Sequence, residues 1–544
     1  MRLSRTSVRS AAALAMFACL FLFPASAHGK GEPKGKIDPS VRTVIGATRG
    51  AQAVPVIVSA PGAVQGVADR LPRGVRITRL PIVDSVAAFL TPSEINALGR
   101  SRRVSRIVAD NPVYGFDYQE SMSVTNLAIG LGDTTPWDEG GPSGDGVTVA
   151  ILDSGIATNT DLGQSRIVGW KDFVNWRRAP YDDAGHGTFV AGLIAGDGTG
   201  SLPLERGGHA TVQFRGVAPA AHIVGVKVLD STGQGRASTL IAGIAWAIQN
   251  KDKYGIEVLN ISIGGNPVGS VRRDPIARAV ELAWRRGIVV VCAAGNEGGF
   301  GAGGILSPGN DPFVITVGST DTRQTADTSD DAVASYSSIG PTLFDEFAKP
   351  DLVAPGNRLI SLRTPGSYID TNFPENLVPV ATYAPTAPAG TLPNYLTLSG
   401  TSTSAPLVAG AAALMLEEDP TLTPDDVKHR LMLTADPVPG AAPGQQGAGA
   451  LDVKEALNEN SRADGFALSP YDGDGKSKFK RGDYAKWEKR GWSRYGWTKF
   501  KWTKFKWTKF KWTKFKWTEV AWTKFKWTEY EWTKFKWTVL LQGQ

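Results

Sequence analysis

The sequence predicts an α/β protein whose main unit is a doubly wound, mostly parallel sheet with helices on both faces. Three observations support this prediction. Apolar segments without polar alternation recur between residues 147 and 318, and segments with helical spacing separate them. A small α+β unit precedes this region, and a low-complexity tail with a five-residue repeat follows it.

Charge divides the chain into three units. Residues 28–118 contain 13 Lys and Arg against 7 Asp and Glu, residues 119–475 contain 23 against 40, and residues 476–544 contain 20 against 5. Two Cys in 544 residues exclude a disulfide scaffold, and a hydrophobic content of 42% excludes a disordered chain. After residue 25, no apolar run reaches the roughly 18 residues that indicate a membrane span.

Residues 1–27 have the pattern of a secretory signal peptide. Three arginines precede an apolar run from Ala11 to Phe23, and Ala25-Ser26-Ala27 forms a small-residue cleavage site. A single membrane anchor is the alternative, but the run is shorter than the roughly 20 residues that a span needs. We therefore expect a secreted protein with no transmembrane segment in its mature form.

Residues 54–109 predict a small folded unit with the element order βαββαβ. Its expected strands are residues 54–59, 75–80, 84–90 and 104–109, and its expected helices are residues 62–71 and 91–102. The sequence Thr91-Pro92-Ser93-Glu94 has the composition of a capping box at a helix start. This order is typical of ferredoxin-like units, which by themselves do not indicate a function.

The main region predicts a parallel sheet with crossover helices. The expected strands are residues 147–152, 222–229, 258–263, 287–293 and 313–318, and the expected helices are residues 239–253 and 271–286. Ligands of such sheets bind beyond the carboxyl ends of the strands. Cys292 falls within an expected strand and is interpreted as a buried thiol.

Three polar residues stand at strand ends or helix starts. Asp153 ends the first strand, His186 lies between two glycines before a helix of small residues, and Ser402 opens the helix that continues through Leu416. A serine becomes a nucleophile when a base accepts its proton, and a carboxylate fixes the tautomer of that base. Alone, Asp153 or Ser402 would be a cap and His186 a metal ligand or a loop residue. Together they predict acyl transfer.

The motifs around these residues, in the order Asp, His, Ser, resemble those of the subtilisin-like serine proteases, whose triad follows the same order. Further similar blocks are residues 227–230, 260–265, 293–296, 334–338 and 349–356, and the resemblance covers about residues 123–457. It implies a subtilisin-like fold and a secreted serine endopeptidase. Its implied catalytic residues are Asp153, His186 and Ser402, and peptide hydrolysis would proceed through an acyl-enzyme.

The resemblance also assigns roles to other residues. Asn296 would donate a side-chain hydrogen bond to the oxyanion, with the Ser402 backbone N–H as second donor. An extended peptide would pair with two edges, one at Ser262, Gly264 and Gly265 and the other on a strand ending near Gly233. A broad apolar pocket for the residue before the cut bond would be floored by Ala293, Ala294 and Gly295.

Two departures from the family pattern affect the serine motif. The family usually has Met and Ala after the nucleophile, and here Thr403 and Ser404 follow, so Ser404 is a second candidate. The spacing to Pro406 favours Ser402. An insertion from about Thr364 to Leu396 precedes the motif and predicts a hairpin or a flap near the site.

Competing site types fail on particular residues. An α/β-hydrolase would need G-x-S-x-G with its serine first in the chain. Gly299, Gly301 and Gly304 match G-x-G-x-x-G, but no helix follows to bind a pyrophosphate. A calcium-loop pattern that starts at Asp472 fails at Lys476. No cofactor is required for the expected chemistry, and the resemblance leaves structural calcium as an expectation without an assigned site.

The resemblance implies that residues 28–118 are a prodomain that assists folding and inhibits the enzyme until it is cut off. Its basic charge would favour docking on the acidic unit. The expected division is a signal peptide at 1–27, this prodomain with its folded part at about 54–109, a catalytic domain at 119–460, a linker at 461–486 and a repeat tail at 487–544. We expect a monomer that acts on polypeptides.

The tail contains a tryptophan every five residues from Trp487 to Trp537, most often as Trp-Thr-Lys-Phe-Lys. This period matches neither a helix nor a strand. Aromatic rings interleaved with lysines suit an anionic cell-surface polymer, while a repeat expansion without a ligand and docking on the acidic unit are alternatives. A surface-binding protein with the protease fold as a carrier is therefore the second function considered. The complete set of catalytic residues favours the enzyme.

Overall fold

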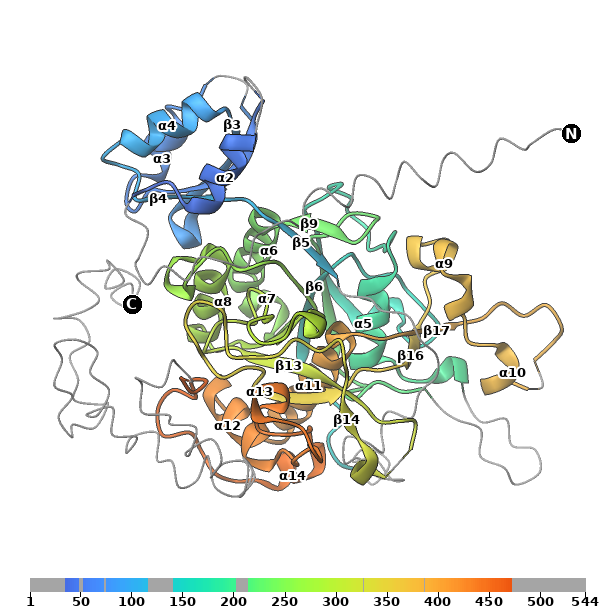
Figure 1. The fold of residues 1–544 in the computed structure, drawn as a ribbon. Helices are drawn as coiled ribbons and strands as arrows, with labels where there is room; N and C mark the ends of the chain where they lie inside the picture. Colours follow the sequence, from blue (N-terminus) through green and yellow to red (C-terminus); the bar gives the residue numbers. More distant parts are fainter. Residues whose placement is uncertain are drawn as a thin grey trace, which may run out of the picture.

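The computed structural model describes residues 35–47, 52–72, 75–115, 140–201, 214–325, 327–385 and 387–471 of the chain. The predicted signal peptide and the repeat tail lie outside the described residues. A small α+β unit lies against a larger α/β unit, and an extended segment passes from the first into the second (Figure 1). None of the helices in these ranges combines the length and the apolar content needed to cross a membrane.

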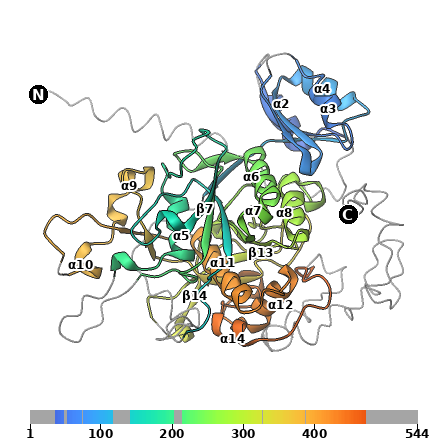
Figure 2. The same cartoon turned by 180° about the vertical axis from the view of Figure 1, so that it is seen from behind.

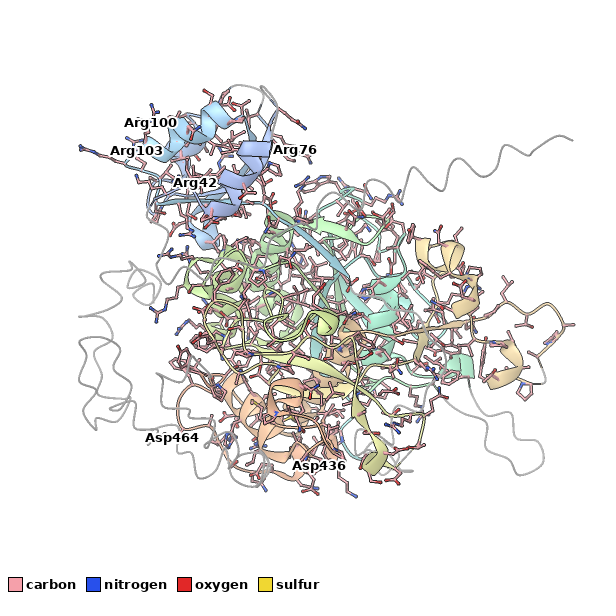
Figure 3. All side chains as sticks on the ribbon, viewed as in Figure 1. Arg42, Arg76, Arg100, Arg103, Asp436 and Asp464 are labelled. Atoms are coloured by element: carbon pink, nitrogen blue, oxygen red, sulfur yellow. The ribbon has the colours of Figure 1, made fainter. Side chains whose placement is uncertain are left out.

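The small unit is a four-stranded antiparallel sheet with the strand order β2-β3-β1-β4. Its elements are α2 (Pro39–Ala47), β1 (Val54–Ser59), α3 (Val64–Ala68), β2 (Ile77–Leu80), β3 (Ser85–Leu90), α4 (Pro92–Arg100) and β4 (Arg106–Ala109). From β1 to β4 the order matches the expected βαββαβ, and α2 is an additional helix. The capping box forms, because Glu94 N donates to Thr91 Oγ1 and Thr91 N donates to Glu94 Oε2. Figure 3 shows labelled arginines, among them Arg42 and Arg103, on the outside of this unit.

The large unit contains a sheet with the order β14-β13-β12-β10-β6-β8-β7, and β15 pairs with β13. All its pairs are parallel except the one between β13 and β14, so the prediction of a mostly parallel sheet is confirmed. The strands are β6 (Thr148–Asp153), β7 (Ile167–Asp172), β8 (His222–Lys227), β10 (Ile256–Ile261), β12 (Val289–Ala293), β13 (Ile315–Asp321), β14 (Ala332–Val333) and β15 (Leu352–Pro355).

Helices cover the sheet. Two helix pairs pack on its strands: α5 (His186–Ala195) packs against α11 (Thr401–Glu418), and α6 (Ala237–Gln249) packs against α8 (Pro275–Arg285) (Figure 2). Every residue of α5 is buried, which explains its composition of small and apolar residues. Further helices of the large unit are α7 (Lys251–Tyr254), α12 (Pro424–Thr434), α13 (Pro443–Gln446) and α14 (Val453–Asn458).

The insertion starts and ends on a two-stranded antiparallel hairpin of β16 (Leu359–Leu362) and β17 (Tyr395–Leu398). Between the strands lie two short helices, α9 (Tyr368–Asn372) and α10 (Val380–Tyr383). Figure 1 shows α9 and α10 on the side of the molecule where α5 lies. The sequence left a hairpin and a flap open; the flanking strands form a hairpin, and the two helices were not foreseen.

A buried charge cluster joins the last described segment to the sheet. Asp351 Oδ2 lies 2.6 Å from Lys349 Nζ, and Asp351 Oδ1 lies 3.2 Å from Lys428 Nζ. Ser469 Oγ donates to Asp351 Oδ1 at 2.6 Å. Burial by itself would raise the pKa of Asp351, but the two ammonium groups more than offset it, so this pKa lies below its ordinary value. The cluster thus ties β15, α12 and the segment around Ser469 together.

We predict that Asp351→Ala lowers the free energy of unfolding by about 3–5 kcal/mol, because two lysines would remain buried without their carboxylate. Urea unfolding at neutral pH measures this change. Asp252→Ala, on the exposed surface of α7, is the matched control and should change the free energy by less than about 0.5 kcal/mol. A loss at Asp351 as small as that of the control would mean that the cluster does not hold the fold together.

Candidate active site

A hydrogen bond between a buried carboxylate and a buried imidazole forms the centre of the site. Asp153 is the last residue of β6 and His186 is the first residue of α5. His186 Nδ1 lies 2.7 Å from Asp153 Oδ1, and both side chains are at most 3% exposed. Asp153 Oδ1 also accepts from the Ser154 N–H at 2.7 Å. This pairing places the proton on Nδ1 and leaves Nε2 as the basic nitrogen.

Asp182, which the sequence analysis did not single out, organises the segment before His186. Its Oδ1 accepts from Ser154 Oγ at 2.8 Å and from the Gly185 N–H at 2.8 Å. Its Oδ2 accepts from the N–H and the hydroxyl of Thr188. Burial raises the pKa of Asp182, and these hydrogen bonds partly offset that rise. No sequence pattern indicates this role, because the partners come from β6, the loop and α5.

Ser402 is the second residue of α11 and is fully buried in this structure. The hydroxyls of the next two polar residues face elsewhere. Thr403 Oγ1 donates to the Gly356 and Gly400 carbonyls, and Ser404 Oγ is directed to the Gly400 carbonyl at 3.5 Å. A Cβ added at Gly356 would lie only 2.1 Å from Ser404 Oγ. These contacts favour Ser402 over Ser404 as the nucleophile.

Asn296 is oriented by Thr401, which the sequence analysis also missed. The Thr401 N–H and the Thr401 hydroxyl both donate to Asn296 Oδ1 at 3.0 Å. Thr401 Oγ1 in turn accepts from the Gly295 N–H at 3.0 Å. Because the amide oxygen is held by two donors, the amide NH₂ is the end that remains to donate to a ligand. These bonds hold the Asn296 side chain beside Thr401, the residue that precedes Ser402.

The two predicted substrate-binding edges hold a strand of the same chain. The short strand β5 (Pro112–Gly115) pairs antiparallel with both β11 (Ile263–Gly264) and β9 (Gln234–Arg236). Gly265 makes close approach possible, because a Cβ there would lie 2.6 Å from the Pro112 carbonyl oxygen. Ser262 is buried beside this edge, and Ser262 Oγ accepts from Asn260 Nδ2.

The expectation of a strand ending near Gly233 is wrong. β8 ends at Lys227, and Gly233 lies in the turn that precedes β9, with φ of +74°. The Gly233 N–H donates to the Asp230 carbonyl, which closes this turn. A positive φ favours glycine, so the turn explains why a glycine stands at this position.

The expected pocket floor is buried main chain. Ala293 ends β12, and the Ala294 N–H donates to the Val317 carbonyl. Gly295 has φ of +109°, and a Cβ there would lie 2.8 Å from the Leu306 side chain. Small residues are therefore required at this position. Within the described ranges, no group of three or more His, Cys, Asp or Glu side chains is arranged to hold a metal ion.

Comparisons with known proteins show the family of this chain. The subtilase family (Peptidase_S8) matches residues 144–455. This chain belongs to the subtilase family. It is 42% identical to the serine protease AprX of Bacillus subtilis (strain 168) over 387 residues, which are 70% of this chain and 80% of that protein. It is 37% identical to subtilisin DY of Bacillus licheniformis over 54% of this chain and 85% of that protein.

A solved structure shares the fold. Fervidolysin from Fervidobacterium pennivorans, a keratinolytic enzyme related to subtilisin, matches with a TM-score of 0.54 and 20% identity, over 79% of this chain and 64% of that one. The chain is thus a subtilisin-like serine protease, and its predicted fold class and enzyme class are confirmed.

We predict that Thr401→Val lowers the kcat for peptide hydrolysis about fivefold with little change in KM. The substitution keeps the shape but removes the hydroxyl, which donates to Asn296 Oδ1 and accepts from the Gly295 N–H, so the amide loses about one neutral hydrogen bond and the Gly295 N–H loses its acceptor. Steady-state kinetics on a soluble peptide measures both constants. An unchanged kcat would show that the backbone N–H of Thr401 suffices to orient the amide.

Proposed function

We propose that this subtilase is a secreted serine endopeptidase with Ser402 as nucleophile, His186 as general base and Asp153 as the carboxylate that orients it. The observation that carries the proposal is the buried 2.7 Å contact between Asp153 Oδ1 and His186 Nδ1 at the carboxyl end of β6. It supports a base whose Nε2 can accept the hydroxyl proton of a serine. α11, which carries Ser402, packs directly on α5, which carries His186.

The reaction follows from these groups. Ser402 Oγ attacks the carbonyl carbon of the peptide bond while its proton passes to His186 Nε2. The Asn296 amide and the Ser402 N–H stabilise the negative charge on the oxygen. The C–N bond then breaks, and His186 gives its proton to the leaving amine, which leaves an acyl-enzyme. A water molecule then attacks the ester carbon while its proton passes to His186 Nε2. The ester C–O bond breaks, the acid product leaves, and His186 returns the proton to Ser402 Oγ.

The substrate would bind as an extended strand between β9 and β11, where β5 lies in this structure. Main-chain pairing of this kind gives affinity for many sequences, and selectivity comes from side-chain pockets. Small residues at 293–295 suit a broad apolar pocket for the residue before the cut bond. The steps above use only Ser402, His186, Asp153, Asn296 and a water molecule, and structural calcium stays an expectation from the family resemblance.

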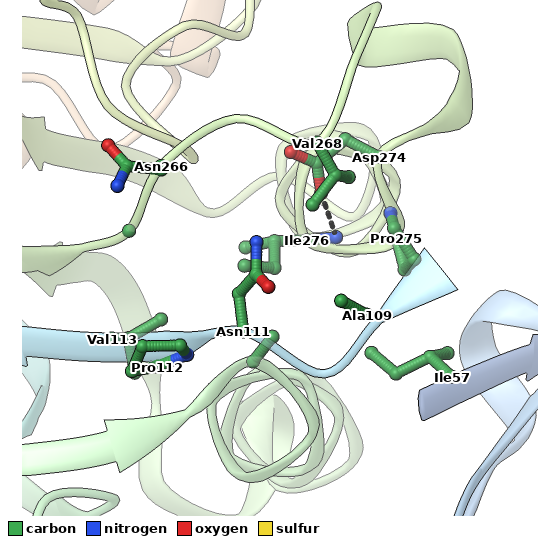
Figure 4. A pocket seen from close by; sticks show the side chains of 12 residues that line it. Ile57, Ala109, Asn111, Pro112, Val113, Asn266, Val268, Asp274, Pro275 and Ile276 are labelled. Carbon is green, nitrogen blue, oxygen red and sulfur yellow. Dashed lines mark hydrogen bonds between the residues drawn. The ribbon is translucent and has the colours of Figure 1, made fainter. Parts of the chain in front are cut away.

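We further propose that the protein is made as a zymogen in which residues 28–118 are the inhibitory prodomain and residues 119–460 the catalytic domain. Asp110 supports this, because its carboxylate accepts from the N–H and the hydroxyl of Ser238 and so caps the start of α6. The Ala237 N–H donates to the Asn111 carbonyl at 2.9 Å. Figure 4 shows the Asn111 side chain pointing towards Ile276 in the first turn of α8, which Asp274 caps by accepting from the Ile276 N–H.

In this arrangement β5 occupies the place of a substrate, and the chain continues from Gly115 towards the proposed mature start near residue 119. The same Ser402 would cut the precursor and later substrates. The cut segment would remain paired with β9 and β11 until the prodomain is released or degraded. Self-processing therefore reports on the catalytic residues without any added substrate.

We predict that Ser402→Ala abolishes peptide hydrolysis and leaves an uncut precursor that retains residues 28–118. In subtilisin itself, loss of the nucleophile lowers turnover by about 10⁶. Electrophoresis and N-terminal sequencing of the purified protein measure processing. Normal maturation of this variant in isolation would contradict the assignment.

Ser404→Ala is the matched control for this experiment. Because Ser404 Oγ faces the Gly400 carbonyl, its removal should leave processing intact and activity within about threefold of the wild type. Loss of activity with a preserved fold in this control would move the nucleophile to Ser404.

We propose that the signal peptide directs export and that the repeat tail attaches the enzyme to an anionic cell-surface polymer. The tail contributes 20 Lys and Arg against 5 Asp and Glu, whereas residues 119–475 are strongly acidic. Electrostatic binding of this kind weakens steeply with salt through counterion release, while stacking by tryptophan resists salt. The alternative in which the tail alone is functional is disfavoured by the assembled site.

We predict that truncation after Gly475 leaves turnover of a soluble peptide nearly unchanged and removes most binding to cell envelopes. Co-sedimentation of the Ser402→Ala protein, with and without the tail, across a salt series measures attachment. Equal binding of both forms would exclude a targeting role for the tail and favour a repeat expansion without a ligand.

A further inference from the structure

A bidentate ion pair between Arg363 and Asp370 stabilises the start of the insertion. Arg363 Nε lies 2.5 Å from Asp370 Oδ1, and Arg363 Nη2 lies 3.0 Å from Asp370 Oδ2. The Gly366 N–H also donates to Asp370 Oδ2, and Arg363 Nη1 donates to the Pro393 carbonyl. Bidentate pairs of this kind fix both distance and orientation. They hold α9 in one place relative to the β16–β17 hairpin.

An aromatic cluster anchors the second half of the insertion. The rings of Tyr383 and Tyr395 lie 4.8 Å apart, and Phe214 packs edge-on against both. The Tyr395 hydroxyl donates to Asp161 Oδ2 at 2.7 Å. The described part of the insertion is therefore packed on the protease unit and is not an open flap.

The helix α9 contacts the segment that leads into His186. Its first two residues donate backbone hydrogen bonds to that segment, Tyr368 N to the Asp183 carbonyl at 2.9 Å and Ile369 N to the Ala184 carbonyl at 3.0 Å. N–H groups in the first turn of a helix have no partner within the helix, so they are available for such bonds. A Cβ added at Gly185 would lie 2.5 Å from Ser367 Oγ, which shows how closely the two segments approach.

The opposite side of the same segment is held by the protease core. Asp182 accepts from Ser154 Oγ, and the buried ammonium of Lys227 lies 2.5 Å from Asp183 Oδ1. The segment 182–185 is thus bonded to the core on one side and to the insertion on the other. The position of the His186 ring depends on this backbone, and a displacement of about 1 Å at a catalytic group can cost about 10² in rate.

We propose that the insertion of residues 364–396 is a positioning element for His186, and that the two backbone bonds from α9 hold the imidazole in line with Asp153 and the nucleophile. This inference rests on the proposed function, because the position of His186 matters only if it is the catalytic base. Tyr368 and Ile369 are positioning residues and contact no reacting atom.

The backbone bond can be removed without removing the helix. Tyr368 is the first residue of α9, a position where proline suits the helix and lacks only an N–H that the helix does not use. Ser367 before it is extended, with ψ of 169°, as a residue before proline must be. Tyr368→Pro deletes the donor to Asp183 together with the ring, and Tyr368→Ala deletes the ring alone. The difference between the two variants therefore reports the hydrogen bond.

Each purified protein is first titrated with an acylating active-site inhibitor, and kcat and KM are then measured per titrated site. We expect Tyr368→Pro to have a kcat about fivefold below that of Tyr368→Ala, with KM within twofold. A merely structural role would reduce the titrated fraction or the melting temperature and leave kcat per site unchanged. Equal kcat per site in both variants overturns the inference and leaves the proposed function standing. A wild type that the inhibitor does not acylate overturns the proposed function itself.

If Tyr368→Pro does not fold, a second variant tests the same inference. Asp370→Asn keeps every N–H of α9 but removes the charge that ties the helix to Arg363. We expect kcat per titrated site to fall about threefold, with KM unchanged. Leu392→Ala, at an exposed position of the same insertion, is the control and should match the wild type. An unchanged kcat in Asp370→Asn overturns the inference.

Discussion

The buried hydrogen bond between Asp153 and His186 is the interaction on which the rest of the site depends. Burying a carboxylate in an apolar interior is costly unless donors contact it, and here the Ser154 N–H and the imidazole both contact Oδ1. The parallel sheet makes this possible, because β6 is buried along its whole length and delivers Asp153 to its carboxyl end. In the same register, Lys227 of β8 lies beside Asp153 and its ammonium reaches Asp183.

The remaining groups of the site come from segments far apart in sequence and are held in pairs. Asn296 is oriented by Thr401, and the segment before His186 is held by Asp182 from within and by α9 from outside. In each case a group of the proposed chemistry is held by hydrogen bonds from a distant part of the chain. Such preorganisation lowers the reorganisation that a reaction would otherwise require. The buried cluster around Asp351 lies outside the site, and it holds β15 and the last described segment together.

Local sequence patterns predicted many strands of the main sheet. They did not predict features that depend on contacts between distant residues. The apolar runs that became β6, β8, β10, β12 and β13 were evident from composition, and so was the capping box at Thr91. The edge strand β7 was missed, because its Gly-Trp-Lys-Asp segment carries no apolar run. Asp153, His186 and Ser402 were predicted from their positions at strand ends and helix starts, and Asn296 from the family resemblance. The roles of Asp182, Thr401 and α9 depend on tertiary contacts between distant residues, which no local period encodes.

Covalent labelling by a serine-directed phosphonylating reagent tests whether Asp153, His186 and Ser402 act as one unit. The mature enzyme is labelled, digested and analysed by mass spectrometry, beside a His186→Ala protein matured in trans by added wild-type enzyme. We predict one label per molecule, on Ser402, and a labelling rate at least about 10³-fold lower without His186. A label on Ser404, or equal labelling of Ser402 without His186, would contradict it.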